Sequence, residues 1–156
     1  MIKILITQAG TGWSGLTKTE QAKWLSAAGK ELLAQGISQW FGVRWDCKEE
    51  KNRELATERN AWGKPFLVCH PEIHFNISHS GCLAACGFGD EPLGLDIQQC
   101  AAADYFRMAD RFYTEADREL LRRTEETDRQ KAFYQIWTKE ESYAKWLGTA
   151  LPKSIG

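Results

Sequence analysis

The sequence contains no long hydrophobic run and carries almost no net charge. No apolar stretch approaches the roughly 18 residues that a membrane-spanning helix needs, so no membrane association is expected. Twenty Lys and Arg residues stand against 21 Asp and Glu, a formal net charge of -1. Nucleic-acid-binding domains are usually basic. We therefore expect neither a membrane nor a nucleic acid as a partner.

Several common functional motifs are also missing. The sequence has no G-x-x-x-x-G-K-[ST] loop, no G-x-G-x-x-G turn and no G-x-S-x-G nucleophile elbow. The cysteines are odd in number and form no C-x-x-C pair: Cys47, Cys69, Cys82, Cys86 and Cys100. This pattern favours free thiols in a reducing compartment. The segment Met1 to Thr7 is too short and too weakly flanked to be a secretory signal. We predict a cytoplasmic protein.

The composition is that of an ordinary globular domain. Hydrophobic residues make up 43% and charged residues 26% of the 156 positions. A single domain of this length buries about 70% of the surface of its unfolded chain. We therefore predict one domain over residues 1–156.

The first half predicts a strand and a long helix. Ile2 to Thr7 is short and rich in β-branched residues, which favours a strand. Thr17 and Glu20 match a capping box, so a helix should begin there and run to about Phe41. The apolar stripe of this helix has spacings of three and four: Leu25, Ala28, Leu32, Gly36 or Ile37, and Trp40. A short strand is expected over residues 66–69.

The second half predicts a small sheet followed by helices. Apolar and polar residues alternate over 73–78, and residues 82–88 indicate a buried strand. Residues 93–97 predict a third strand, giving an antiparallel meander. Thr114 can cap a helix over 115–123, and Asp128 a longer one over 129–147. Five residues of the longer helix should face the core: Phe133, Ile136, Trp137, Ala144 and Leu147. The predicted class is α+β, an antiparallel sheet packed against helices.

Asp96 is the first candidate site residue. It lies between Leu95 and Ile97 in an apolar segment, where a carboxylate is costly unless it is paired or bound to a cation. The alternative is a residue on the solvent side of a two-sided sheet. Gln98 follows two residues later and should share the face of Asp96. Two oxygen ligands at this spacing suit a hard cation such as Mg²⁺.

Other candidates lie in the last helix and near the end of a strand. Trp137, Glu141 and Lys145 are four residues apart and share one helix face, although an exposed ion pair is the simpler interpretation. His79 should follow a strand, and its serine neighbours and Gly81 are typical of an anion pocket. A buried structural histidine is the alternative there.

Four short motifs, taken in order, resemble the 4′-phosphopantetheinyl transferase superfamily, in its surfactin-synthetase-type branch. They are W-G-K-P at 62–65, F-N-I-S-H-S-G at 75–81, G-L-D-I-Q at 94–98 and W-x-x-x-E-S-x-x-K at 137–145. Each motif alone is weak evidence, but all four at the family's spacing are strong. The resemblance covers about residues 60–152. It divides the domain into a divergent N-terminal half, 1–60, and a motif-bearing half, 61–156.

The resemblance implies a fold, a reaction and a set of site residues. The fold would have two pseudo-related halves, the second abbreviated. Family members use Mg²⁺ to move the phosphopantetheine arm of coenzyme A onto a serine of an apo acyl or peptidyl carrier protein, releasing adenosine 3′,5′-bisphosphate. Asp96 and Glu141 would hold the metal, with Gln98 as a weak ligand, and Glu141 would also be the base. Coenzyme A would contact Lys64, Ser78, His79 and Lys145, with His79 near its 3′-phosphate.

The sequence departs from the family pattern at three places. Gln98 stands where a second carboxylate is usual, and Glu140 where a basic residue is usual. The chain stops at Gly156, where relatives continue into further strands, and the short N-terminal part lacks the family's basic helix. Two alternatives follow: a degenerate paralogue that binds coenzyme A or a carrier protein without catalysis, and a metal-dependent phosphohydrolase.

The missing strands also imply an open sheet edge. An unpaired edge is a template for pairing with another chain. The apolar strand over 82–88 would make that edge adhesive, so self-association into a homo-oligomer is expected. The competing expectation is that the N-terminal strand, or the loop over 10–15, covers the edge within one chain.

Overall fold

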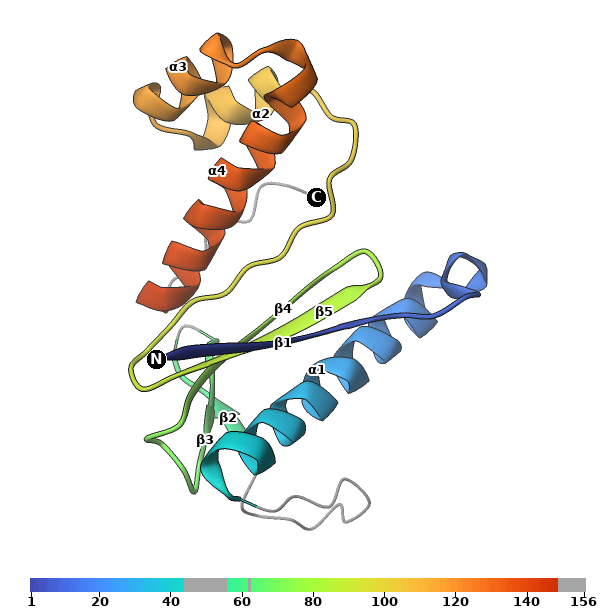
Figure 1. Cartoon of the computed structure of the whole chain (residues 1–156), viewed down its shortest axis with the longest axis vertical. Coiled ribbons are helices and arrows are strands. Elements are labelled where there is room, and N and C mark those ends of the chain that lie inside the picture. Colours follow the sequence, from blue (N-terminus) through green and yellow to red (C-terminus); the bar gives the residue numbers. More distant parts are fainter. Residues whose placement is uncertain (44–55, 62, 149–156) are drawn as a thin grey trace.

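The structure is a computed structural model that describes residues 1–43, 56–61 and 63–148. Cys47, and Trp62 of the W-G-K-P motif, lie outside the described residues. A three-stranded antiparallel sheet has the order β1-β5-β4, formed by Ile2–Gln8, Leu83–Gly89 and His74–Ser80. Helix α1, Lys18–Phe41, lies along one side of this sheet, and the remaining helices lie on the other side (Figure 1). The predicted α+β class is confirmed.

The N-terminal predictions are confirmed by the elements around α1. The Thr17 hydroxyl accepts a hydrogen bond from the Glu20 amide at 3.3 Å, and the Glu20 carboxylate accepts one from the Thr17 amide at 2.8 Å. The helix ends at Phe41, where Gly42 takes a left-handed conformation with φ 70°. A short 3₁₀ turn, η1 (Trp13–Gly15), connects β1 to this cap.

The first core lies between α1 and the sheet. Its fully buried members include Ile37 of α1 and Cys86 and Phe88 of β5. Gly36 is needed here, because a Cβ at that position would overlap the ring of Phe88. Burial raises the pKa of the Cys86 thiol to about 12, so this thiol is inert as a nucleophile.

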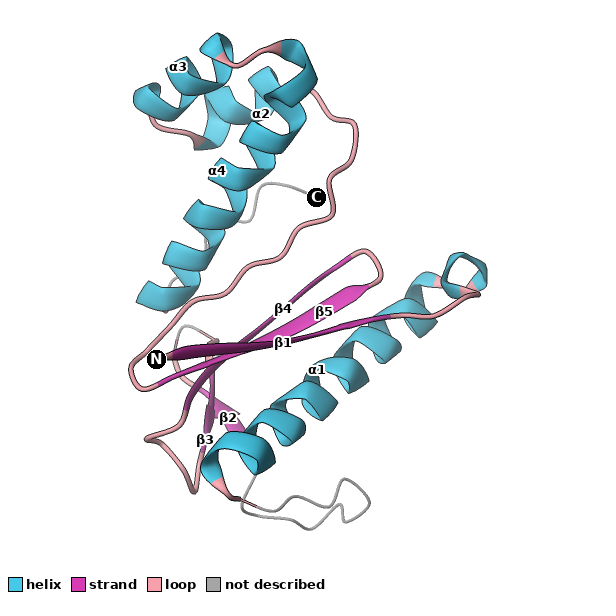
Figure 2. Cartoon of the chain, viewed as in Figure 1, coloured by secondary structure: helices cyan, strands magenta, loops and turns pink. Residues whose placement is uncertain are grey.

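The strand predicted over 93–97 is wrong. Residues 93–99, here called the bridging segment, belong to no strand; they cross the face of β4 and β5 opposite α1 (Figure 2). The free edge of β5 is already taken, because β1 pairs with β5 along its whole length. The bridging segment therefore lies on the sheet instead of extending it.

The same pairing corrects the expectation of an adhesive edge at residues 82–88. β5 is the central strand, with β1 on one side and β4 on the other. The competing expectation, that the N-terminal strand covers this edge within one chain, is confirmed. Self-association itself stays a prediction.

The C-terminal helices form a second core. Helix α2 (Tyr105–Phe112) was not predicted, α3 (Glu115–Arg123) has the predicted bounds and Thr114 cap, and α4 spans Glu126–Leu147. Phe133 of α4 is fully buried against Tyr113 and Leu121. Leu147, predicted to face the core, is 50% exposed. The reason is that α2 and α3 cover only the first part of α4 (Figure 1).

The start of α4 also differs from the prediction. The helix begins three residues before Arg129, so Asp128 lies in its first turn instead of capping it. A carboxylate in a first helical turn is still favourable, because it faces the positive end of the helix dipole. A two-stranded sheet of β2 (Thr57–Arg59) and β3 (Pro65–Leu67) completes the described fold; β3 overlaps the predicted strand, and β2 was not predicted.

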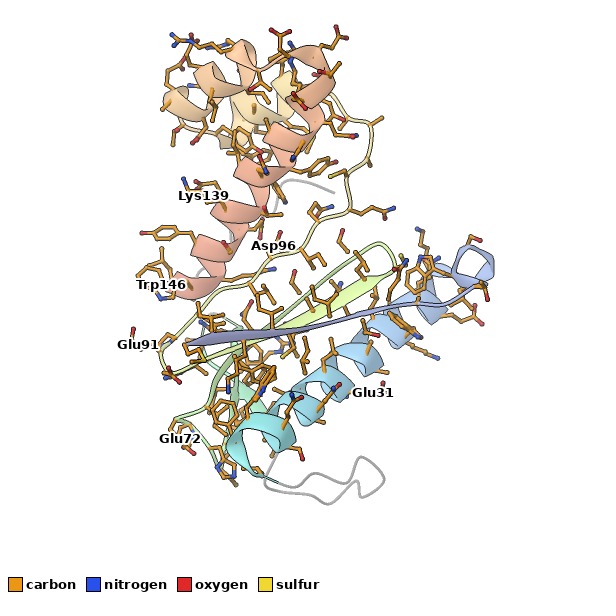
Figure 3. The ribbon with its side chains drawn as sticks, in the orientation of Figure 1. Glu31, Glu72, Glu91, Asp96, Lys139 and Trp146 are labelled. Atoms are coloured by element: carbon orange, nitrogen blue, oxygen red, sulfur yellow. The ribbon has the colours of Figure 1, made fainter. Side chains whose placement is uncertain are left out.

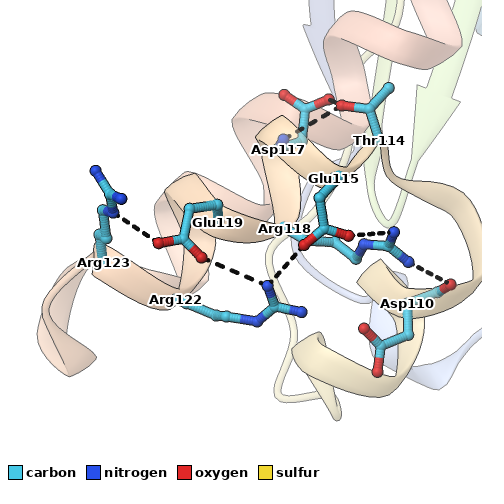
Figure 4. A network of polar contacts seen from close by, with 8 residues as sticks. All are labelled: Asp110, Thr114, Glu115, Asp117, Arg118, Glu119, Arg122 and Arg123. Carbon is cyan, nitrogen blue, oxygen red and sulfur yellow. Dashed lines mark hydrogen bonds and ion pairs between the residues drawn. The ribbon is translucent and has the colours of Figure 1, made fainter.

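Helix α3 carries an ion-pair network on its surface (Figure 4). Arg122 lies between Glu115 and Glu119, at 3.0 and 3.5 Å, and Arg118 and Arg123 extend the network at either end. These side chains are mostly exposed, and surface pairs of this kind contribute about 0–1 kcal/mol each. The network supports the helix and offers no site.

Gly94 sets how closely α4 approaches the bridging segment. A Cβ at Gly94 would overlap the carbonyl oxygen of Ser142 and lie 2.6 Å from the backbone nitrogen of Trp146. Both are backbone atoms of α4, which cannot move aside as a flexible side chain can. The contact is therefore available only to glycine.

We predict that Gly94→Ala lowers the free energy of unfolding by about 1–3 kcal/mol, because overpacking forces the two segments apart. Gly10→Ala is the matched control, since a Cβ there would meet nothing within 4 Å. Urea denaturation of the two variants makes the comparison. Equal stability of Gly94→Ala and Gly10→Ala would contradict the close approach.

Candidate active site

A ladder of side-chain hydrogen bonds holds the bridging segment on β4. Backbone amides of every second residue in the segment donate to side-chain oxygens of every second residue in the strand. The pairs are Leu95 to Asn76, Ile97 to Ser78 and Gln99 to Ser80, at 3.0, 3.2 and 3.0 Å. Each pair is 19 residues apart, so the segment runs parallel to β4 in a fixed register. The ladder places Asp96 over the middle of the strand.

The polar face of β4 was predicted from its alternation, but the use of that face was not. Asn76 and Ser80 were not proposed as site residues. Their regular spacing with Ser78 was the available signal, since side chains two apart share one face of a strand. Sequence alone did not indicate that the partner would be a backbone crossing that face.

Asp96 forms the centre of the site. Its side chain is 7% exposed, and Oδ1 accepts from Lys145 Nζ at 2.6 Å and from Ser78 Oγ at 2.8 Å. Lys145 Nζ also donates to Ser78 Oγ at 3.0 Å. Asp96 therefore lies beside the second half of α4, between the levels of Lys139 and Trp146 (Figure 3). The structure brings three of the predicted site residues into direct contact.

The second oxygen of Asp96 is buried and has no hydrogen-bond partner. A buried acceptor without a partner costs roughly 1–3 kcal/mol, so this atom is poised for a donor or a cation. This orphaned oxygen is the observation that fits a metal. The surface alternative considered for Asp96 is wrong, because the side chain is covered.

Glu141 lies one helical turn before Lys145 on α4. Burial raises the pKa of its carboxyl group, the nearby Asp96 raises it further, and Lys145 lowers it. The carboxyl group of Glu141 therefore interacts electrostatically with both members of the Asp96–Lys145 pair. Two carboxylates and one ammonium meet here, and a divalent cation would relieve the repulsion between the carboxylates. Among the described residues, no third His, Cys, Asp or Glu joins such a cluster.

Lys64, the residue before β3, contacts the same region. Its Nζ donates to the carbonyl oxygen of Leu93 at 2.9 Å and lies 3.4 Å from that of Trp146. Burial lowers the pKa of this lysine. The side chain thus ties the start of the bridging segment to the end of α4, near the predicted metal ligands.

The structure separates Ser78 from His79, which were expected to share an anion pocket. His79 does not follow a strand; it lies inside β4 and is exposed, so the buried alternative is wrong too. Because neighbouring side chains of a strand point to opposite faces, His79 points to the α1 side of the sheet. Ser78 points to Asp96.

Gln98 and the neighbours of Glu141 lie at the rim. Gln98 is exposed, and its side-chain amide donates to the Gln99 carbonyl at 3.4 Å instead of meeting Asp96. Lys139 is exposed and Glu140 partly buried. Trp137 is partly buried and packs edge to face on Phe112 of α2, so it belongs to the second core.

No helix in the described part of the chain is both long and apolar enough to cross a bilayer. Of the cysteines, Cys82, Cys86 and Cys100 are unbridged, in agreement with the predicted thiols.

Comparison with known proteins identifies the family of this site. Residues 92–156 match the family model described as the 4′-phosphopantetheinyl transferase superfamily. This range contains the bridging segment and the whole of α4, and therefore Asp96, Glu141 and Lys145.

Individual relatives cover more of the chain. The 4′-phosphopantetheinyl transferase gsp of Aneurinibacillus migulanus is 32% identical over 100 residues, 64% of this chain and 41% of that protein. The 4′-phosphopantetheinyl transferase Sfp of Bacillus subtilis is 33% identical over 90 residues, 58% of this chain and 40% of its own. The 4′-phosphopantetheinyl transferase HetI of a Nostoc species is 33% identical over 131 residues, 81% of this chain and 52% of its own.

The chain thus spans about half the length of these relatives, or less. The family model covers the motifs at 94–98 and 137–145, and the relatives gsp and Sfp confirm the resemblance to the surfactin-type branch. The segment that carries Asp96, Glu141 and Lys145 belongs to the 4′-phosphopantetheinyl transferase superfamily.

Proposed function

We propose that this protein transfers the 4′-phosphopantetheine arm of coenzyme A to a serine of an apo acyl or peptidyl carrier protein. The observation that carries the proposal is the buried Asp96, whose Oδ1 is held by Lys145 and Ser78 while Oδ2 has no partner. The family match of the surrounding residues supports the reaction class.

The reaction exchanges one phosphorus–oxygen bond for another. The carrier serine oxygen forms a bond to the phosphorus that bears pantetheine. The bridging pyrophosphate bond breaks, and adenosine 3′,5′-bisphosphate leaves with the electron pair. The serine proton needs a base, because a neutral hydroxyl is a poor nucleophile. Glu141 is the base we propose, directly or through one water.

The raised pKa of Glu141 suits this role. Burial and the charge of Asp96 both disfavour its ionised form, so the carboxylate holds a proton more strongly than an exposed glutamate does. A base with a pKa nearer to neutrality takes a proton more effectively at physiological pH. Lys145, on the same helix face, would then neutralise charge on the phosphates.

Asp96 and Glu141 are the residues we propose to hold Mg²⁺. When bound, the cation would neutralise the pyrophosphate oxygens and stabilise the charge that develops on them. Gln98 is a third, weak ligand in this proposal, because its exposed side chain can give up a long hydrogen bond and turn. Lys64 and His79 remain the predicted contacts for the nucleotide of coenzyme A, whereas the Ser78 hydroxyl is already bonded to Asp96 and Lys145.

The first test is transfer of a fluorescent label from labelled coenzyme A to an apo carrier protein in the presence of Mg²⁺. We expect covalent labelling of the carrier, and we expect Asp96→Ala and Glu141→Ala each to lower it on the order of a hundredfold or more. Lys139→Ala, at an exposed position of the same helix, should retain activity.

The outcome also separates the alternatives. Free phosphopantetheine without labelled carrier would indicate a hydrolase. Coenzyme A or carrier binding without turnover would indicate a degenerate paralogue. Near-normal transfer by a folded Asp96→Ala protein would refute the assigned metal site.

The second test concerns the carboxyl group of Glu141. Its folded-state pKa is raised from 4.5, so the folded protein binds this proton more tightly than the unfolded chain. The folded state therefore loses stability as pH rises from about 4.5 through the raised pKa. We predict that Glu141→Gln is more stable than wild type at pH 8 in EDTA, and that this advantage vanishes near pH 4.

Urea denaturation at the two pH values measures the difference. Added Mg²⁺ should stabilise wild type more than the variant, because only wild type keeps both carboxylate ligands. A variant that is less stable than wild type at pH 8 in EDTA would show that the carboxylate is not strained by its surroundings.

The third test addresses Gln98. We predict that Gln98→Glu lowers the Mg²⁺ concentration needed for half-maximal transfer, because a carboxylate binds a hard cation more strongly than an amide. Gln99→Glu is the matched control, since it adds the same charge one residue away at another exposed position. Identical Mg²⁺ titrations for wild type and Gln98→Glu would place Gln98 outside the metal ligands.

A further inference from the structure

Ser78 lies between the sheet and the site. It is in the middle of β4, opposite Ala85 of β5, and is 4% exposed under the bridging segment. Ser78 and Asn76 are the two polar residues of the described part of the chain that are buried as whole residues, each 4% exposed. A buried hydroxyl needs hydrogen-bond partners, and Ser78 obtains them from three other residues.

The hydroxyl of Ser78 has no bonding capacity left. A serine oxygen offers one O–H donor and two acceptor lone pairs. Ser78 donates to Asp96 Oδ1 at 2.8 Å, and it accepts from the Ile97 amide at 3.2 Å and from Lys145 Nζ at 3.0 Å. A direct hydrogen bond to a coenzyme A phosphate would require Ser78 to release one of these partners.

These three bonds orient the charged groups around Asp96. Ser78 and Lys145 both approach Oδ1, which leaves Oδ2 as the oxygen without a partner. Without the hydroxyl, the ammonium of Lys145 would lose one acceptor and Asp96 one donor. The carboxylate could then turn, and both of its oxygens would be open to the ammonium. A lysine that occupies both oxygens competes with any cation for them.

We propose that Ser78 is a positioning residue: its hydroxyl directs Lys145 to one oxygen of Asp96 and keeps the other open for a divalent cation. This inference rests on the proposed function of the same site. In this role Ser78 orients the proposed metal ligand Asp96 and does not contact the nucleotide of coenzyme A. Supporting groups of this kind typically change metal affinity 10- to 100-fold when they are removed.

The test measures metal and nucleotide binding separately on the full chain. Mn²⁺ binding is followed by electron paramagnetic resonance, and coenzyme A binding by equilibrium dialysis in EDTA. We expect Ser78→Ala to weaken Mn²⁺ binding by about tenfold or more and to change coenzyme A binding less than about twofold. Ser78→Thr, which keeps the hydroxyl, should restore most of the Mn²⁺ affinity.

Ser80→Ala is the matched control. Ser80 accepts one bond of the same ladder, from the Gln99 amide, and does not bond to Asp96 or Lys145. It should leave Mn²⁺ affinity within about twofold of wild type. If Ser78→Ala does not fold, Ser78→Cys keeps the volume with only a weak donor, and it should lower Mn²⁺ affinity in the same direction.

Three results would overturn the proposal: lost coenzyme A binding with unchanged Mn²⁺ binding in Ser78→Ala, an equal loss of Mn²⁺ affinity in Ser80→Ala, or unchanged Mn²⁺ affinity in folded Ser78→Cys. Failure of the proposed function is distinguishable. Mn²⁺ binding that depends on Asp96 and Ser78, in a protein that transfers no label, would refute the transferase and support the role of Ser78.

Discussion

The structure depends on the hydrogen bonds between the side chains of β4 and the backbone of the bridging segment. A buried backbone amide must find a partner, and here the usual partner, a neighbouring strand, is replaced by one amide oxygen and two hydroxyl oxygens. The segment can therefore lie on the face of the sheet without leaving those donors unsatisfied. Asp96 and the helix that meets it both take their positions from this arrangement.

The space on that face is provided by small residues. Gly87 of β5 leaves room for Leu93 and Leu95, whose side chains would lie within 3.4 Å of a Cβ at that position. Gly94 then allows the backbone of α4 to touch the segment. Glycine is unfavourable in strands and extended segments on its own. Its presence at both positions follows from the close packing of three layers: sheet, segment and helix.

The local elements of this fold were largely readable from sequence, because they depend on local signals. The Thr17 capping box and the period of the apolar residues fixed α1, and Thr114 fixed α3. Charge placement was informative too: Asp96, Glu141 and Lys145 were singled out, and two of them are in direct contact. These predictions rest either on contacts between residues that are close in sequence or on the free-energy cost of burying a charge.

The features that the sequence did not reveal depend on contacts between residues far apart in the chain. An apolar run such as 93–97 looks the same whether it joins a sheet at its edge or lies across it. Residues 93–97 lie across the sheet because β1, which is far away in sequence, already pairs with the edge of β5. The same limit applies to His79 and Ser78. Their separation onto opposite faces depends on where β4 ends, and a strand end is the least certain feature of a sequence pattern.

The constant offset of 19 residues in the ladder has a consequence for how this chain can vary. The link between β5 and the bridging segment, residues 90–92, looks like an ordinary surface turn, and surface turns usually tolerate insertions and deletions. Here the number of residues in the turn sets which side chain of the bridging segment lies beside Lys145. One added residue would shift every later amide by one position along β4, and the side chain facing Lys145 would become Leu95 instead of Asp96. Natural variants of this chain should therefore change the sequence of the turn freely but keep its length.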